Sequence, residues 1–189
     1  MTDTRARILD GAGDALVRFG LAKTTVEDIA SAAGVGRATV YRWFEGGRSE
    51  VFDALVAREL GKVADEIIVR IGSGDDLAAG LHEVLRWGGP AIRGHTLLQA
   101  ALDTGPEELA VRLARLEHGF EDLVAPMVAE RLAASAASPS PEDDAAYLVA
   151  MMMSVVANPG SWDLEDDDEV GRLVDTLMRS ATGAPGSAR

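Results

Sequence analysis

The segment GVGRATVYRWF, residues 34–44, gathers basic and aromatic side chains within a chain that is acidic overall. Arg37, Tyr41, Arg42 and Trp43 fall within seven consecutive positions, whereas the 189 residues together have a formal net charge of −13. Guanidinium groups bind phosphates and the edge of guanine, and tyrosine hydroxyls bind phosphates. Their concentration on one short segment indicates a surface for nucleic acid.

The charge is distributed unevenly along the chain. Residues 1–50 contain as many basic as acidic side chains, and residues 51–189 carry the whole net charge of −13. Overall acidity does not exclude binding to DNA, because DNA senses charges within a Debye length of ~10 Å. For the acidic part, the alternative to a specific partner is a charged surface that keeps the protein in solution.

Hydrophobic periodicity predicts an all-α protein with about nine helices, no convincing strand and no internal repeat. The composition agrees, since Ala, Leu and Val dominate and aromatic residues make up only 5%. The expected helices lie at about 8–19, 25–33, 37–44, 50–71, 76–88, 90–102, 104–133, 141–157 and 166–181. Pro90 is expected to open the sixth of them, and Pro126 to kink the seventh.

Two of these helices are short and are separated by a glycine turn. Thr25 is a suitable N-cap, with Asp28 three residues later as in a capping box. Gly34 ends this helix, and Val35 and Gly36 form the turn into the next. Such a helix, turn and second helix make a helix-turn-helix, whose second helix can enter the major groove of DNA.

The second helix has the polarity that this role requires. Arg37 stands at its start, where base-reading residues lie, and Thr39 and Tyr41 fall near the same exposed side. Val40 and Phe44 are four residues apart and face inward. The alternative is an ordinary helical hairpin in which the arginine and tyrosine only decorate the surface.

The N-terminal region closely resembles the DNA-binding domain of the TetR (tetracycline repressor) family of bacterial transcription regulators. The matching words are ILDGAGDALVRFG, TTVEDIASAAGVGRATVYRWF and RSEVFDAL, between about Arg5 and Phe52. The resemblance implies a DNA-binding domain at residues 1–48, a ligand-binding and dimerisation domain at 49–182 and a flexible tail at 183–189. It also implies a ligand-responsive regulator, most often a repressor that a small apolar or amphipathic effector releases from a palindromic operator.

The resemblance assigns DNA-binding roles to individual residues. Arg37, Ala38 and Thr39, which follow the turn at Gly36, match the base-reading positions. Tyr41, Arg42 and Trp43 match a tyrosine-rich segment that grips the backbone and thymine methyl groups. Thr25 and Arg48 match two positions that contact phosphate. This chain departs from the family at Arg48, where lysine is usual, at Trp43, where histidine is frequent, and in the EGGR turn, which is one residue longer.

The C-terminal part has apolar stripes at 147–155 and 170–177, which the resemblance assigns to a homodimeric four-helix bundle. Burial of these stripes within one subunit is the alternative. Six residues have the aromatic, soft or hydrogen-bonding character of a ligand pocket. They are Trp87, His95, Gln99, Phe120, Tyr147 and Met151, and plain core packing is the alternative for each.

The sequence gives no support for an enzyme. It has no GxSxG, P-loop or GxGxxG motif, and its three histidines lack metal-ligand spacing, so no catalytic residue, metal or cofactor is assigned. The acidic run EDDDE, residues 165–169, fits a helix N-terminus better than a calcium site. Without a signal peptide or an apolar run long enough for a membrane span, a cytoplasmic protein is expected. A helical small-molecule-binding or scaffold protein without DNA activity is the alternative function.

Overall fold

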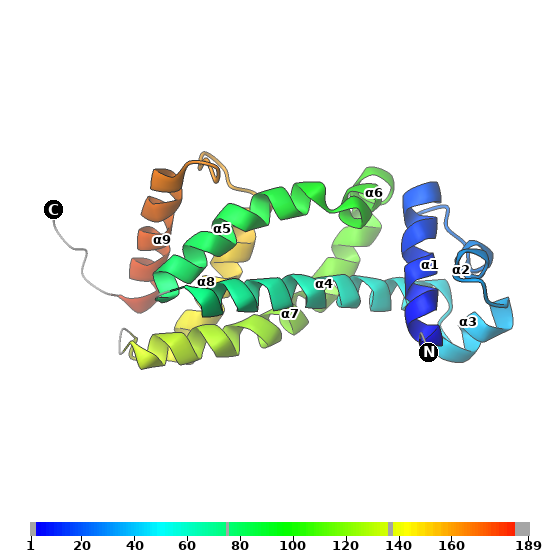
Figure 1. The fold of residues 1–189 in the computed structure, drawn as a ribbon, viewed down its shortest axis with the longest axis horizontal. Helices are drawn as coiled ribbons and strands as arrows, with labels where there is room; N and C mark the ends of the chain where they lie inside the picture. Colours follow the sequence, from blue (N-terminus) through cyan, green and yellow to red (C-terminus); the bar gives the residue numbers. More distant parts are fainter. Residues whose placement is uncertain (1–2, 75, 136–137, 184–189) are drawn as a thin grey trace. The chain divides into compact units, whose positions relative to one another are not determined.

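The computed structural model describes residues 3–74, 76–135 and 138–183, except the side chains of 102, 104, 112–120 and 157. Within these ranges the chain forms nine α-helices and no strand, which confirms the all-α prediction (Figure 1). In order they are α1 Thr4–Phe19, α2 Val26–Ala33, α3 Arg37–Trp43, α4 Arg48–Ser73, α5 Leu77–Gly94, α6 Thr96–Thr104, α7 Pro106–Ala134, α8 Pro141–Ala157 and α9 Asp167–Thr182. Among the described helices, no stretch combines the length and the apolar composition that a membrane span requires.

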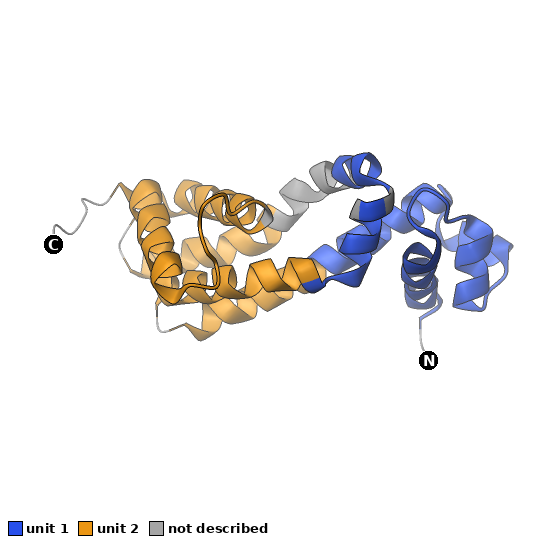
Figure 2. Ribbon diagram, turned by 90° about the horizontal axis from the view of Figure 1, so that it is seen from above, with its two compact units in different colours: residues 1–60, 94–117 blue, residues 61–93, 118–189 orange. Residues whose placement is uncertain are grey.

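The chain divides into two compact units (Figure 2). One comprises residues 1–60 and 94–117, and the other comprises residues 61–93 and 118–189. The first unit therefore includes α6 and the start of α7 as well as α1–α3. Both α4 and α7 continue from one unit into the other. The functional division at residue 48 stays a prediction.

The first unit is built on a core to which α1, α2, α3 and α4 all contribute. The largest fully buried side chains in it are Ile8, Leu9, Ile29, Val40, Phe44, Val51 and Phe52. Leu97 and Leu98 of α6 pack against the same core. Because Val40 and Phe44 are anchored there, the orientation of α3 is set by the packing of the whole unit.

Helix α1 contacts α2 so closely that only a glycine fits at one position. A Cβ atom on Gly11 would lie 2.6 Å from the backbone nitrogen of Ala33. Near this point the Nη2 of Arg7 donates to the carbonyls of Ala33 and Gly34 at 2.8 and 3.1 Å. These contacts fix the C-terminal end of α2 and the turn that follows it.

The prediction for residues 88–102 was wrong in detail. Pro90 does not open a helix but lies inside α5, which continues to Gly94. Helix α6 begins instead at Thr96, where the Nδ1 of His95 accepts a hydrogen bond from the Leu98 amide at 3.3 Å. A proline within a helix forfeits one backbone hydrogen bond without necessarily ending the helix, whereas a capping side chain marks a new start.

In the second unit, the apolar stripe of α9 is buried within a single chain. Val170, Leu173, Val174 and Leu177 are all buried, and α9 packs on α8. The acidic run at 165–169 begins α9, as expected, and Asp166 caps it by accepting from the Glu169 amide at 2.9 Å. Glu165 also pairs with Arg93 at 3.1 Å.

We expect Gly11→Ala to destabilise the protein, because the added methyl group meets the backbone of α2, which cannot give way like a flexible side chain. Overpacking of this kind costs about 1–3 kcal/mol. The matched control is Gly61→Ala in α4, where a Cβ meets nothing within 4 Å. That substitution should stabilise by about 0.5–1 kcal/mol, since alanine favours helix over glycine. Urea denaturation of the three proteins measures both changes, and an unaltered midpoint for Gly11→Ala would contradict the close contact.

Candidate nucleic-acid interface

The turn between α2 and α3 is built from backbone hydrogen bonds that require a glycine. Gly34 has a φ of 63°, in the left-handed region, and its amide donates to the carbonyls of Ala30 and Ser31. The Val35 amide donates to Ala30 O at 3.0 Å. Gly36 is the N-cap residue of α3, and its carbonyl accepts from the Thr39 amide at 2.8 Å. The helix-turn-helix geometry expected from the sequence is therefore present.

Helix α3 has one buried side and one exposed side. Val40 and the C-cap residue Phe44 are buried, as expected from their spacing. Most of the remaining side chains of the segment are exposed, and Thr39 is half-buried. The exposed residues are Gly36, Arg37, Ala38, Tyr41, Arg42 and Trp43. Two of them, Tyr41 at 38% and Trp43 at 43%, are large hydrophobic residues open to solvent.

Arg37 is held in place on this exposed side by two neighbours. Its Nη1 forms an ion pair with Glu27 of α2, and its Nη2 lies 3.4 Å from the hydroxyl of Tyr41. The guanidinium carbon also stands 5.4 Å from the centre of the Tyr41 ring. The hydrogen bond to Tyr41, and then the charge of Glu27, raise the pKa of Arg37 above its ordinary value. The guanidinium thus remains charged and directed across the α2–α3 surface.

The long EGGR turn has a structural role at Gly47. This residue has a φ of 62°, and a Cβ on it would lie 2.9 Å from Cε1 of Tyr41. The turn is closed by the Gly47 amide, which donates to Phe44 O at 2.9 Å, and by Glu50, which accepts from the Gly46 amide at 2.8 Å. The additional glycine lets the chain pass close to Tyr41.

Arg48 has partners inside the first unit rather than toward solvent. Its Nε donates to Thr24 O at 2.8 Å, its Nη2 donates to Leu21 O, and its Nη1 pairs with Glu108 of α7 at 3.2 Å. The guanidinium carbon also lies 5.1 Å from the centre of the Phe52 ring. Contact of Arg48 with phosphate stays a prediction, and it requires this side chain to leave its present partners.

The side chain of Thr25 also has a local partner. Its hydroxyl oxygen accepts from the Asp28 amide at 3.2 Å and lies 2.6 Å from Oδ2 of Asp28, which in turn accepts from the Thr25 amide. This is the capping box expected from the sequence. The hydrogen bonds from Thr25 hold the pKa of Asp28 below its ordinary value. Among the described side chains, no ion pair involves Arg42 of α3.

Two residues of this surface were missed in the sequence. Arg7 holds the α2–α3 turn, and Glu27 holds Arg37. Nothing in the sequence connects Arg7 with carbonyl groups 26 residues away. Glu27 could have been found, because an acidic residue in the first turn of α2 stands close to the start of the following helix once the turn is drawn.

The six predicted pocket residues do not form one described site. His95 and Gln99 belong to the first unit, whereas Trp87, Tyr147 and Met151 belong to the second. His95 caps α6, and Trp87 stacks with Arg70, whose guanidinium carbon is 4.3 Å from the ring centre. The side chain of Phe120 lies outside the described side chains.

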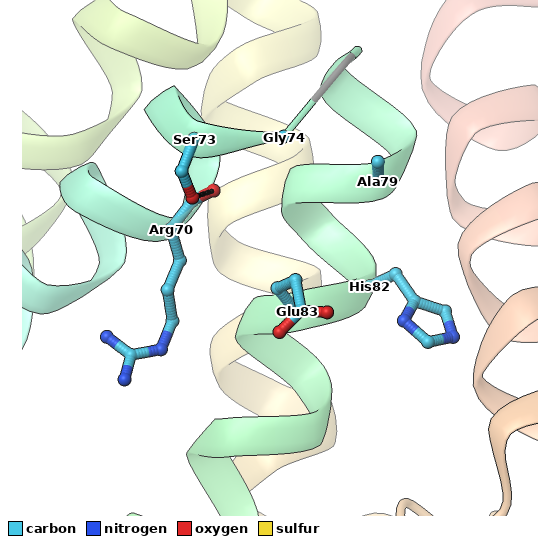
Figure 3. A pocket seen from close by; sticks show the side chains of 6 residues that line it. All are labelled: Arg70, Ser73, Gly74, Ala79, His82 and Glu83. Carbon is cyan, nitrogen blue, oxygen red and sulfur yellow. Dashed lines mark hydrogen bonds between the residues drawn. The ribbon is translucent and has the colours of Figure 1, made fainter.

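A hollow of about 470 Å³ does occur in the second unit, at the turn between α4 and α5 (Figure 3). None of the six predicted residues lines it. Its lining is largely polar and consists of Arg70, Ser73, Gly74, Ala79, His82 and Glu83. Arg70 is also paired with Glu66, one helical turn away. A polar hollow of this kind differs from the apolar pocket expected for the effector.

Comparison with known proteins places this surface in a family. The family described as bacterial regulatory proteins, tetR family, matches residues 8–55, which include α2, α3 and the turn between them. The HTH-type transcriptional regulator Rv1255c of Mycobacterium tuberculosis (strain H37Rv) is 28% identical over 193 residues, covering 97% of this chain and 88% of the relative. The HTH-type transcriptional regulator TtgR of Pseudomonas putida is 41% identical over 54 residues, which are 29% of this chain and 25% of TtgR.

Similarity to a solved structure extends over nearly the whole chain. The TetR family repressor AlkX from a Dietzia strain aligns with a TM-score of 0.67 at 20% identity, covering 96% of this chain and 97% of AlkX. At this identity the likeness shows the fold alone. The matched proteins are transcriptional regulators and not enzymes. Residues 8–55 thus match the DNA-binding region of the tetR family of bacterial regulatory proteins, and the whole chain is similar to an HTH-type transcriptional regulator and has the fold of a TetR family repressor.

Proposed function

We propose that this regulator is a homodimeric repressor that a small apolar or amphipathic effector releases from a palindromic operator. The observation that carries the DNA-binding part is the exposed side of α3, where Arg37, Tyr41, Arg42 and Trp43 stand free of the core while Val40 is buried. A helix with this polarity, preceded by a turn and a second short helix, suits the major groove.

Within this proposal the exposed residues divide into two groups. Arg37, Ala38 and Thr39 read base edges, and Arg37 suits guanine because its guanidinium matches the O6 and N7 acceptors. Tyr41 and Trp43 contact backbone and thymine methyl groups, and Arg42 binds phosphate. Gly36 allows close approach of the backbone, and the Thr25 hydroxyl reaches a phosphate at the start of α2. Arg48 has the least support as a DNA contact, because its guanidinium already donates hydrogen bonds to groups within the first unit.

Dimerisation is proposed through α8, on the face that the single chain leaves open. On a helical projection Tyr147, Ala150, Met151, Met153 and Ser154 share one broad face. Tyr147 and Met153 are exposed, and Met151 is half-buried. The apolar stripe of α9 at 170–177 is buried within one chain, which supports the alternative that these residues are core residues of the subunit and not part of the dimer interface. A two-fold dimer would bind a palindrome with half-sites in successive major grooves, roughly 34–36 Å apart.

The effector is proposed to bind the domain expected at 49–182. Its candidate contacts are Trp87, His95, Gln99, Phe120, Tyr147 and Met151. AlkX, which shares the fold, is implicated in biodegradation of n-alkanes, and this guides the choice of probe by analogy only. Helix α4 runs without interruption from one compact unit into the other, so it is the covalent route for a conformational change. The effector must bind the two states with unequal affinity.

A helical scaffold or small-molecule-binding protein without DNA activity is the competing function. It would leave the basic and aromatic side of α3 without a purpose. The variants described next separate the two functions, because only a DNA-binding protein loses affinity for a duplex when a residue on α3 is changed.

We expect Arg37→Ala to weaken binding to the operator by about 1–3 kcal/mol, with a much smaller effect on random DNA. The operator is defined as the duplex that the protein enriches from a random pool. Arg48→Ala should instead lower the melting temperature, because it leaves the carbonyls of Leu21 and Thr24 without this donor. Fluorescence anisotropy across a salt series and thermal melting measure these effects.

The salt series also tests whether Arg48 contacts DNA. A phosphate contact would reduce the salt slope by about one unit per subunit when Arg48 is removed. Arg42→Ala, at an exposed arginine of α3, is the positive control for that reduction. If Arg37→Ala lowered the affinity for the operator and for random DNA equally, Arg37 would not be a base-reading residue. If no α3 variant changed binding to any duplex, the DNA-binding role of α3 would be refuted.

For the dimer, we expect wild-type protein to show twice the chain mass of 19.9 kDa by light scattering. Tyr147→Asp should yield monomer, because it places an unpaired charge in the proposed seam. Val69→Asp is the control, since Val69 is also an exposed apolar residue but lies on α4. Leu173→Asp is unsuitable as a seam variant, because Leu173 is buried within the chain and the variant would unfold. Monomeric wild type at micromolar concentration would exclude the seam.

For the effector, we expect a medium-chain alkane or fatty acid to raise the melting temperature and to weaken operator binding. At a ligand concentration 100 times the Kd, mass action stabilises by about 2.7 kcal/mol. Trp87→Phe tests whether Trp87 reports on the site through its fluorescence. If neither class of probe shifts the melting temperature at saturation, the apolar effector is excluded. Unchanged ligand-dependent quenching in Trp87→Phe would exclude Trp87 as the reporter.

A further inference from the structure

Glu27 lies in the first turn of α2, and its carboxylate forms an ion pair with Arg37 at the start of α3. The side chains of Glu27 and Arg37 are 56% and 60% exposed. Ion pairs this exposed contribute little to folding, because water and salt screen them. The pair therefore matters for what happens when DNA approaches the same surface.

The ion pair acts on a side chain that is already restrained. The Tyr41 hydroxyl lies 3.4 Å from Nη2 of Arg37, and the Tyr41 ring lies beneath the guanidinium at 5.4 Å. Glu27 and Tyr41 thus hold the guanidinium from two different helices, α2 and α3. Arg42, on the same helix and also exposed, forms no ion pair among the described side chains.

The two arginines consequently meet DNA under different conditions. Arg42 can bind any phosphate without giving up an anionic partner. Arg37 must leave a carboxylate, and that carboxylate then stands unpaired beside a polyanion. A phosphate also fits the guanidinium fork, but it replaces one anionic partner of Arg37 by another, so the exchange brings little net gain on arbitrary DNA. Guanine O6 and N7 meet the same fork only where a guanine lies opposite Arg37, so their contribution to affinity depends on the sequence.

We propose that Glu27 is a specificity-determining residue, which withholds Arg37 from the phosphates of arbitrary DNA and yields it to a base edge. The proposal rests on the proposed DNA-binding function of α3 and assigns a role to a residue outside the recognition helix. It makes Glu27 a positioning residue, since it acts through Arg37.

The test compares Glu27→Gln with wild type on two duplexes, the one enriched by wild-type protein from a random pool and an unselected one of equal length. Glu27→Gln should bind the unselected duplex about three- to fivefold more tightly and the enriched duplex less than about twofold more tightly. The salt slope on unselected DNA should steepen by about one unit per subunit, because Arg37 becomes a phosphate contact. The melting temperature should stay unchanged.

Glu45→Gln is the matched control, because Glu45 is an exposed carboxylate beside α3 that does not pair with Arg37. Removal of its charge should strengthen binding to both duplexes by the same factor. In an Arg37→Ala background, Glu27→Gln should behave like Glu45→Gln, since no guanidinium remains to be withheld.

Two results overturn the inference while the proposed function stands. One is that Glu27→Gln changes the affinity for both duplexes by the same factor. The other is that, in the Arg37→Ala background, Glu27→Gln still changes the ratio of the affinity for the enriched duplex to that for the unselected duplex. Failure of the proposed function itself looks different, because wild-type protein would then enrich no duplex or Arg37→Ala would bind like wild type. In that case this inference falls with it.

Discussion

Burial of Val40 and Phe44 is the constraint on which the DNA-facing surface depends. Helix α3 is only seven residues long, and these two side chains anchor it to the core formed with α1, α2 and α4. Because they fix the rotation of α3 about its axis, Arg37 and Tyr41 are directed outward. The close contact at Gly11 in turn packs α2 tightly against α1, so the positions of α2 and α3 both depend on the core of the first unit.

The arginines of the first unit illustrate how poorly composition alone predicts function. Arg7 and Arg48 donate hydrogen bonds to backbone carbonyls, and Arg58 pairs with Asp10 of α1 at 2.7 Å. These side chains stabilise the unit instead of contributing a free charge toward DNA. Arg42 remains open, and Arg37 is held by Glu27. The functional surface therefore depends on which charges the fold leaves unused, not on how many the sequence contains.

Periodicity was enough to predict the helices and the inward face of α3, because apolar spacing and glycine turns are local signals. Periodicity could not predict long-range partners, since Arg48 and Glu108 are 60 residues apart and no sequence pattern links them. The predicted end of α5 was wrong because the prediction placed the start of a new helix at Pro90, whereas a helix can accommodate a proline. The stripe of α9 could not be assigned from sequence, because burial within one chain and burial between two chains require the same residues.

In the proposed complex, Arg37 reads a guanine in each half of a palindrome. Methylation of guanine N7 on the enriched duplex, followed by separation of bound from free DNA, tests this directly. We expect methylation at one guanine in each half-site to block binding, with the two guanines about one helical turn apart. With Arg37→Ala that interference should disappear while any other positions remain. If the interference persisted in Arg37→Ala, or were absent from the wild-type complex, Arg37 would not be the residue that reads guanine.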